Sequence, residues 1–339
     1  MHGDYVYRRY QKRQPQGSGM GKGYAALATL ILLIVTILFL SLYPKDSKEN
    51  KEVAITPTAT STPAPKRNFP NILSVFSIKK QQTIQSEETL MADIKSLTEK
   101  KHGMYSVYIY DISQDKGYGF NETMIVTAAS ISKIPIIASL YYLAQGGTID
   151  LDERITLQAN DIQDFGTGIL RYNGAGNVYS LKTLANLLIK KSDNTAGYVL
   201  GEKIIGFEKI EELIGSWGLT QTNMEQNKTS NLDISRLLVK MFKGNIASTP
   251  LTTEMMGTFV DTDFENRLPR DIPKDIKVYH KIGNEVGVIH DAGIVALPNH
   301  PYYIGVLTND IIDIPGTEDT IAEISKMVYD FYTESAKSN

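Results

Sequence analysis

The order of hydrophobic and polar positions predicts strands at both ends of a globular region. Near its start, Tyr105, Val107 and Ile109 alternate with residues of the opposite face, which is the period of a strand. GYGF at 117–120 is expected to be its partner strand after a turn at 114–116. Strand patterns return near the end of the chain, over KVYHKIG (277–283), VGVIHDAGIVAL (286–297) and YYIGVLTND (302–310).

Helical spacing occupies the middle of the region and both of its flanks. Ser86 followed by Glu87 and Glu88 is typical of an N-cap with acids in the first turn. Ser180 precedes a second helical pattern, and the stretch from Ile321 to Phe331 predicts a closing helix. The predicted fold class is therefore α+β, with an antiparallel sheet built from both chain ends and a mostly helical middle.

A long apolar run precedes this region. The 20 residues from Tyr24 to Tyr43 carry no charge, and a helix needs about 20 apolar residues to cross a bilayer. Residues 1–22 hold five basic residues and one acid, a net charge of +4. The positive-inside rule then makes 1–22 a cytoplasmic tail and 23–43 a single transmembrane anchor in the cell membrane, with the rest extracytoplasmic. A cleaved signal peptide is the alternative, but no A-x-A site follows the run.

The composition of the rest of the chain predicts a linker and a folded domain, and it excludes several kinds of site. Residues 44–69 are rich in Pro, Thr and Ser and are expected to be an extended linker, which leaves 70–339 as the folded domain. Beyond residue 22 there are 30 basic and 37 acidic residues, a balance of −7, which argues against a nucleic-acid partner. The absence of cysteine excludes disulfides, thiolate metal sites and a cysteine nucleophile.

Several kinds of site are poorly supported. The five histidines have no metal-ligand spacing such as H-E-x-x-H, so neither a metal nor another cofactor is expected. No G-x-S-x-G elbow is present. The glycine-rich GSGMGKG at 17–23 has neither the preceding strand nor the following Ser or Thr of a phosphate-binding loop.

Ser130 and Lys133 are better candidates for chemistry. They are three residues apart, so at the start of a helix both side chains share one face. Pro135 fits only an early turn, which predicts that the helix begins at or just before Ser130. The pattern alone is weak, because 77–80 and 113–116 also match S-x-x-K, and helix capping is the alternative for Ser130.

Two further motifs favour a catalytic role for Ser130 over helix capping. Ser192-Asp193-Asn194 lies at a break between helical patterns, and Lys281-Ile282-Gly283 ends a strand pattern. In this order and setting the chain resembles the penicillin-recognising serine enzymes, and among them the class A β-lactamase-like serine hydrolases, over about residues 86–335. Softer similarities are GTG (166–168), SDNTA (192–196) and HDAGIV (290–295).

The resemblance implies a β-lactamase/transpeptidase-like fold and a role for each motif residue. Ser130 would be the acylated nucleophile, and Lys133 its base or part of the proton path. Ser192 would relay the proton to the leaving nitrogen, helped by Lys281. Asn194 would hold Lys133 and the substrate amide. Gly283 and Asn284 would contact the substrate, with the backbone N–H groups of Ser130 and Asn284 as oxyanion hole. The implied partner is a peptidoglycan stem peptide or a β-lactam.

Two departures from the family pattern put the substrate in question. Ile282 replaces a Thr or Ser whose hydroxyl binds the substrate carboxylate in the family. The segment 220–233 is short and lacks the Glu-x-x-x-Asn pattern of the deacylating glutamate, because four residues after Glu225 stands Thr229. Whether His280 or Asn284 replaces the missing hydroxyl stays open.

The sequence therefore predicts a membrane-anchored serine hydrolase that acts on an amide through an acyl-enzyme. Without the deacylating acid, the acyl-enzyme is expected to persist, as in penicillin-binding proteins. A true β-lactamase is the alternative within the enzyme class. A non-catalytic module that binds or senses peptidoglycan or β-lactams is the alternative outside it.

Overall fold

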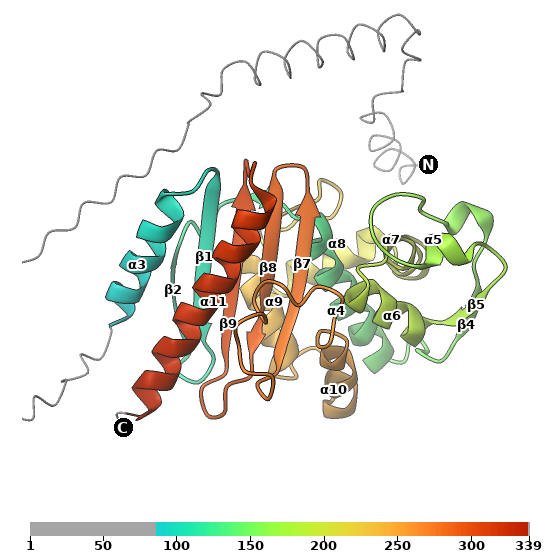
Figure 1. Cartoon of the computed structure of the whole chain (residues 1–339). Coiled ribbons are helices and arrows are strands. Elements are labelled where there is room, and N and C mark those ends of the chain that lie inside the picture. The colour runs from blue at the N-terminus through green and yellow to red at the C-terminus, as the bar shows by residue number, and fades with distance from the viewer. Residues whose placement is uncertain (1–85, 338–339) are drawn as a thin grey trace, which may run out of the picture. The chain divides into compact units, whose positions relative to one another are not determined.

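The computed structural model describes residues 86–337 (Figure 1). The predicted tail (1–22), anchor (23–43) and linker (44–69) lie outside the described residues, as does the start of the predicted domain. Within 86–337, no helix combines the length and the apolar character that crossing a bilayer requires.

A five-stranded antiparallel sheet, in the order β2-β1-β9-β8-β7, joins the two ends of the described chain. Val107 shows the register, because it lies opposite Phe120 on one side and Val306 on the other. This confirms the α+β class and the pairing of early with late strands. The strands are β1 (Met104–Asp111), β2 (Lys116–Phe120), β7 (Val278–Glu285), β8 (Val288–Val295) and β9 (Tyr302–Asn309).

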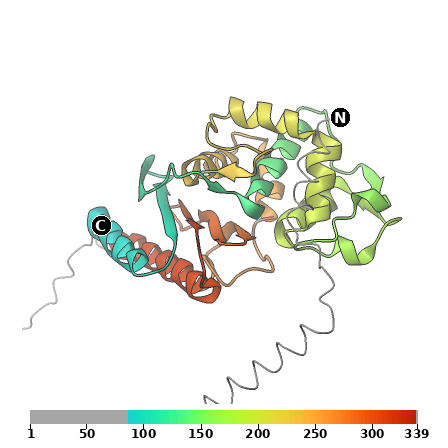
Figure 2. The same cartoon turned by 90° about the horizontal axis from the view of Figure 1, so that it is seen from above.

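Helices cover both faces of this sheet (Figures 1 and 2). On one face lie α3 (Glu87–Glu99) and α11 (Ile314–Lys337), which pack side by side. The predicted cap of α3 is confirmed, since Ser86 Oγ accepts a hydrogen bond from the Thr89 N–H at 3.2 Å. Leu90 and Ile94 of α3 are fully buried in the core between these helices and the sheet.

The other face carries the predicted helical middle. Its longer helices are α4 (Lys133–Gln145), α6 (Leu181–Lys190), α8 (Phe207–Ser216), α9 (Asn231–Phe242) and α10 (Thr249–Gly257). Its shorter elements are the 3₁₀ turns η1 (Ala129–Ser132) and η2 (Ala159–Asp161), the helices α5 (Leu170–Asn173) and α7 (Asn194–Tyr198), the π-helical segment η3 (Val199–Ile205), and two small sheets, β3 (Val126–Thr127) with β6 (Lys228–Thr229) and β4 (Arg154–Thr156) with β5 (Val178–Ser180).

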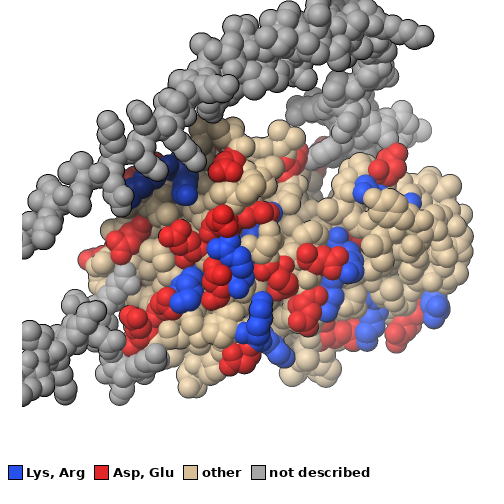
Figure 3. Space-filling view, in the orientation of Figure 1, with Lys and Arg blue, Asp and Glu red and all other residues tan. Residues whose placement is uncertain are grey.

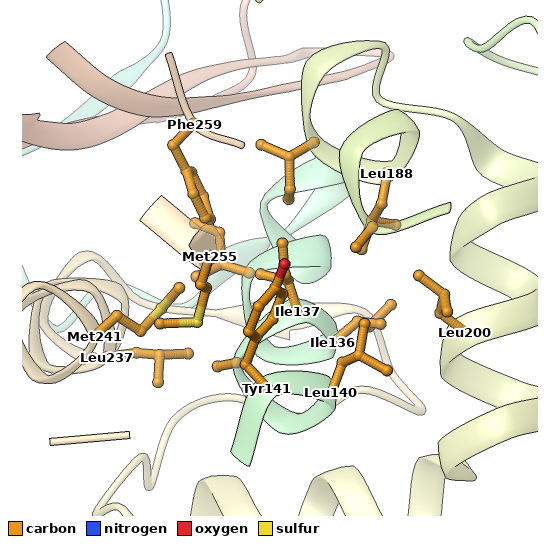
Figure 4. Packing of buried hydrophobic residues seen from close by; sticks show 14 of the residues in the cluster. Ile136, Ile137, Leu140, Tyr141, Leu188, Leu200, Leu237, Met241, Met255 and Phe259 are labelled. Carbon is orange, nitrogen blue, oxygen red and sulfur yellow. The ribbon is translucent and has the colours of Figure 1, made fainter. Parts of the chain in front are cut away.

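Helix α4 is the centre of this half of the molecule. Its residues from Lys133 to Tyr141 are all buried, and Figure 4 shows side chains of α9, α10 and the segment at Phe259 gathered around it. Isoleucines are only moderate helix formers, but each fully buried Ile or Leu contributes about 1.5–3 kcal/mol. Burial therefore holds α4 in place, and with it the residues at its N-terminus.

Acidic and basic side chains are interspersed on the face shown in Figure 3. Many of the charges form ion pairs, such as Arg270 with Asp319 at 2.5 Å and Lys326 with Asp330 at 2.5 Å. Exposed pairs of this kind contribute little to stability.

Candidate active site

Ser130 lies in the 3₁₀ turn η1, directly before α4. Helical structure begins just before Ser130, as predicted, but the α-helix itself starts only at Lys133. The reason is Pro135, which has no N–H to donate to the carbonyl of Ile131, so the first turn lacks that α-helical bond. Ala129 has φ of 48°, a strained backbone conformation for alanine that is common at functional sites. Ser130 is half-buried and remains accessible.

Lys133 is almost fully buried, with 5% of its surface exposed. Its Nζ lies 3.0 Å from Ser130 Oγ, 2.7 Å from Asn194 Oδ1 and 2.7 Å from the carbonyl oxygen of Ser192. Burial lowers the pKa of Lys133 to about 7, although the nearby carboxylate of Asp193 opposes the shift. A substantial fraction of this amine is therefore neutral near pH 7 and able to accept a proton from Ser130.

Ser192 follows α6 with φ of 50° and turns the chain into α7. Its Oγ lies between two amines, 3.2 Å from Lys133 Nζ and 2.9 Å from Lys281 Nζ. Lys281 comes from β7 and also donates to the carbonyl of Ile282 at 2.9 Å. Burial, and secondly the charge of Lys133, hold the pKa of Lys281 well below its usual value. Two amines and two hydroxyls thus form one connected hydrogen-bond chain, which can carry protons.

Asp193 holds this turn to a neighbouring loop, a role that motif spacing did not indicate. Its Oδ1 accepts from the Ala196 N–H at 3.0 Å and caps α7. Its Oδ2 accepts from the N–H groups of Ile169 and Leu170 at 2.7 and 2.9 Å. The carboxylate is 1% exposed, so these three bonds replace its lost hydration.

The GTG segment at 166–168 packs closely against the turn at 192–194. Thr167 Oγ1 donates to the Ser192 carbonyl at 2.7 Å. Gly168 has φ of +115°, and a Cβ there would lie 2.3 Å from the Asp193 carboxyl carbon. A Cβ on Gly166 would lie 2.3 Å from Asn194 Nδ2. Two glycines around a hydroxyl residue are the sequence signal for this close approach.

Gly168→Ala is therefore expected to destabilise the domain by about 3 kcal/mol, because strain at positive φ adds to a clash with a buried carboxylate. Gly176→Ala is the matched control. Gly176 has φ of +89°, but a Cβ there has nothing within 4 Å, so this variant reports strain alone. Denaturant unfolding measures both. Equal losses in the two variants would contradict the close approach at Gly168.

Gly283 and Asn284 continue β7 past Lys281, alongside the Ser130 turn. A Cβ on Gly283 would lie 3.0 Å from Ile131 Cγ1, so the strand touches η1 here. The backbones of Ser130 and Asn284, which the resemblance pairs as oxyanion hole, thus belong to adjacent segments. The side-chain Oδ1 of Asn284 accepts from Arg267 Nη2 at 2.6 Å.

The substituted positions have clear environments. Successive residues of a strand point to opposite faces, so Ile282 lies on the α11 side of β7, opposite Lys281, and is 3% exposed. His280 lies on that same side, fully buried, with Nδ1 2.9 Å from Asp291 Oδ1. Its ring is thus engaged with a carboxylate and does not replace the missing hydroxyl. Glu225 is exposed in the turn that Asn223 and Lys228 close.

The motif residues predicted from the sequence therefore meet in one place. Ser130, Lys133, Ser192, Asn194 and Lys281 are linked by hydrogen bonds, and Gly283 and Asn284 lie on the adjoining strand. The described residues hold no cluster of His, Asp and Glu that could bind a metal ion.

Comparison with known proteins agrees with this arrangement. The model of the β-lactamase enzyme family matches residues 89–332. Beta-lactamase 3 of Bacillus cereus is 25% identical over 250 residues, which cover 68% of this chain and 78% of that protein. A PBP-A variant solved as an acyl-enzyme complex with penicillin G is 25% identical with a TM-score of 0.68, over 73% of this chain and 97% of that one. A β-lactamase from Sphaerobacter thermophilus is 24% identical with a TM-score of 0.67, over 72% and 97%.

Proposed function

This chain belongs to the β-lactamase enzyme family, and from that membership we propose that it is a serine hydrolase that forms an acyl-enzyme at Ser130. The acyl donor is an amide of a cell-wall peptide or a β-lactam. The observation that carries the proposal is the hydrogen-bond chain from Ser130 through Lys133 and Ser192 to Lys281.

The chain of hydrogen bonds supplies each proton transfer that the reaction needs. Neutral Lys133 takes the hydroxyl proton as Ser130 Oγ attacks the carbonyl carbon. The negative charge on the carbonyl oxygen is held by the N–H groups of Ser130 and Asn284, each such donor being worth roughly 3–4 kcal/mol in the transition state. When the C–N bond breaks, Ser192 gives its proton to the leaving nitrogen and regains one from the adjacent amines.

The slow step in this proposal is hydrolysis of the acyl-enzyme. The only glutamate of the short segment 220–233 is Glu225, whose side chain is exposed. A carboxylate in free contact with water is not held against an acyl group on Ser130, so Glu225 does not serve as a fixed base for the hydrolytic water. A PBP-A variant solved as an acyl-enzyme complex with penicillin G supports the formation of such an adduct in this family.

Intact-mass spectrometry of the full chain in detergent tests the proposal. Mixed with penicillin G, the protein is expected to gain one penicillin mass that persists for hours and maps to the peptide holding Ser130. An adduct that turns over within minutes, with released penicilloate, would make the protein a true β-lactamase instead. Reversible binding with no adduct would favour the non-catalytic module.

We also propose that the domain is extracytoplasmic, held by the anchor 23–43 and the linker 44–69. The uncharged run of 20 residues and the basic tail before it support this orientation. The same labelling, done on intact cells with a fluorescent penicillin that does not cross membranes, tests it. Labelling only after lysis would overturn the orientation.

A further inference from the structure

The carbonyl oxygen of Ser192 accepts two hydrogen bonds from side chains of other segments. Lys133 Nζ donates to it at 2.7 Å, and Thr167 Oγ1 donates to it at 2.7 Å. A carbonyl oxygen has two lone pairs, so these two donors use both of them. Ser192 has φ of 50° and lies in the break between α6 and α7, so the direction of its carbonyl depends on its contacts with neighbouring segments.

The acceptors around Lys133 decide how its amine is oriented. The Ser192 carbonyl and Asn194 Oδ1 both lie 2.7 Å from Lys133 Nζ, and both oxygens can only accept hydrogen bonds. A neutral amine has two N–H groups and one lone pair. When these two acceptors take both N–H groups, the lone pair is left on the side of the Ser130 and Ser192 hydroxyls, at 3.0 and 3.2 Å. In this orientation the amine can accept the proton of Ser130.

The loop 165–168 holds both acceptors in place, but by different means. Asn194 is fixed by backbone groups, because its Nδ2 donates to the Phe165 carbonyl at 3.1 Å and its N–H to the Thr167 carbonyl at 3.1 Å. The Ser192 carbonyl is fixed by a side chain, the hydroxyl of Thr167. A substitution of Thr167 can therefore alter one acceptor and leave the other as it is. Thr167 is exposed, so the exchange of its hydroxyl for a methyl group leaves no cavity in the core.

The hydroxyl of Thr167 also competes with Lys133 for the electron density of one oxygen. Without the hydroxyl, the Ser192 carbonyl would bind Lys133 alone, and a stronger hydrogen bond to the charged form of an amine favours that form. The charged side chains that face Lys133 are Asp193 in the same turn and Lys281 on β7. Both have partners other than Thr167, since Asp193 accepts from three N–H groups and Lys281 donates to Ser192 Oγ.

We infer that Thr167 is a positioning residue of the acylation step. Its hydroxyl fixes the Ser192 carbonyl, so that the amine of Lys133 faces Ser130. By sharing that carbonyl, the hydroxyl also limits how tightly the ammonium form of Lys133 is held. The inference rests on the proposed acyl-enzyme function, and it adds to the site a side chain that lies outside the three motifs.

Thr167→Val tests the inference on the full chain in detergent, with penicillin G as the acyl donor. The variant keeps the branched side chain and loses the hydrogen-bond donor. The rate of adduct formation, followed by intact mass from pH 5 to 9, is expected to fall about tenfold on its high-pH plateau, because Lys133 is less well oriented. The pH midpoint of the rate is expected to rise by about half a unit, since the unshared carbonyl holds the ammonium form more tightly.

Three further variants separate the hydroxyl from the rest of the side chain. Thr167→Ala also removes the donor and should raise the midpoint in the same direction. Thr167→Ser keeps the donor, and it is expected to keep the midpoint and a rate within about twofold of the unchanged protein. Thr253→Val is the matched control, because Thr253 is also exposed and its Oγ1 donates to a backbone carbonyl, that of Thr249 in α10 at 2.9 Å. It should change neither the rate nor the midpoint.

The midpoint distinguishes positioning of the base from general support of the turn. A lower rate in Thr167→Val with an unmoved midpoint would overturn the inference, because the hydroxyl would then have no effect on the basicity of Lys133. Equal shifts in Thr167→Val and Thr167→Ser would also overturn it. Both of these results leave the acyl-enzyme function intact, since the unchanged protein still forms the adduct. Failure of the unchanged protein to form an adduct at any pH would overturn the proposed function, and the inference with it.

Discussion

Ser130→Ala is expected to abolish covalent capture, with no adduct of penicillin G at any time. The substitution removes one oxygen, the only atom of the hydrogen-bond chain that can bond to an acyl carbon in the proposed reaction. Lys133 keeps its bonds to Asn194 Oδ1 and to the Ser192 carbonyl, so the cluster stays in place. The rate of adduct formation, measured by intact-mass spectrometry, is expected to fall by about 10³-fold or more, to the limit of detection.

The chain contains its own matched control. Ser113 also stands three residues before a lysine, Lys116, but it lies in the turn between β1 and β2, where its Oγ donates to the Asn299 carbonyl. Ser113→Ala should acylate as the unchanged protein does. An adduct that survives Ser130→Ala would identify a different nucleophile and end the proposed mechanism.

Much of the fold follows from local patterns. Alternation at Tyr105, Val107 and Ile109 predicted β1, and the three late strand patterns became β7, β8 and β9. The cap at Ser86 marked the start of α3. These features depend on neighbours within a few residues, so the sequence alone carries them.

The residues of the candidate site could be predicted from the sequence, but the contacts that hold them in place could not. Ser130, Lys133, Ser192 and Lys281 stand out because they lie in recognisable motifs. The bonds of Asp193 to the GTG loop, and the pairing of Arg267 with Glu318, join residues that are 24 and 51 positions apart in the chain. Contacts of that kind leave no periodic signal, since the two partners lie in separate segments and neither is unusual in its own.

Ile282 shows how the two kinds of information combine. In the sequence motif, Ile282 indicates only that the hydroxyl of the usual Thr or Ser is missing. The structure adds its surroundings, because Ile282 lies on the α11 side of β7 with the buried pairs Arg267–Glu318 and His280–Asp291.

Lys133→Cys is expected to lower the rate of acylation about 10³-fold, because it removes the general base while leaving Ser130 in place. Cysteine is too short to reach Ser130 Oγ, Asn194 Oδ1 and the Ser192 carbonyl at once, so the proton path is also broken.

In the unchanged protein, the rate of acylation should rise with pH through about 7, since only the neutral form of Lys133 accepts a proton and its pKa is about 7. The rate at which the penicillin G adduct forms, followed by intact mass from pH 5 to 9, measures both effects.

Alkylation of the Lys133→Cys variant then distinguishes a role of Lys133 as base from a purely structural role. The chain has no other cysteine, so 2-bromoethylamine applied to the denatured variant converts position 133 alone to aminoethylcysteine, a lysine with sulfur in its side chain. After refolding, acylation should return, and its pH midpoint should move below that of the unchanged protein because this amine is the weaker base. The unchanged protein taken through the same treatment is the control. A restored rate with an unmoved midpoint would mean that Lys133 fills space and positions Ser130 but accepts no proton. The shift of the midpoint is therefore the result that assigns the proton to this amine.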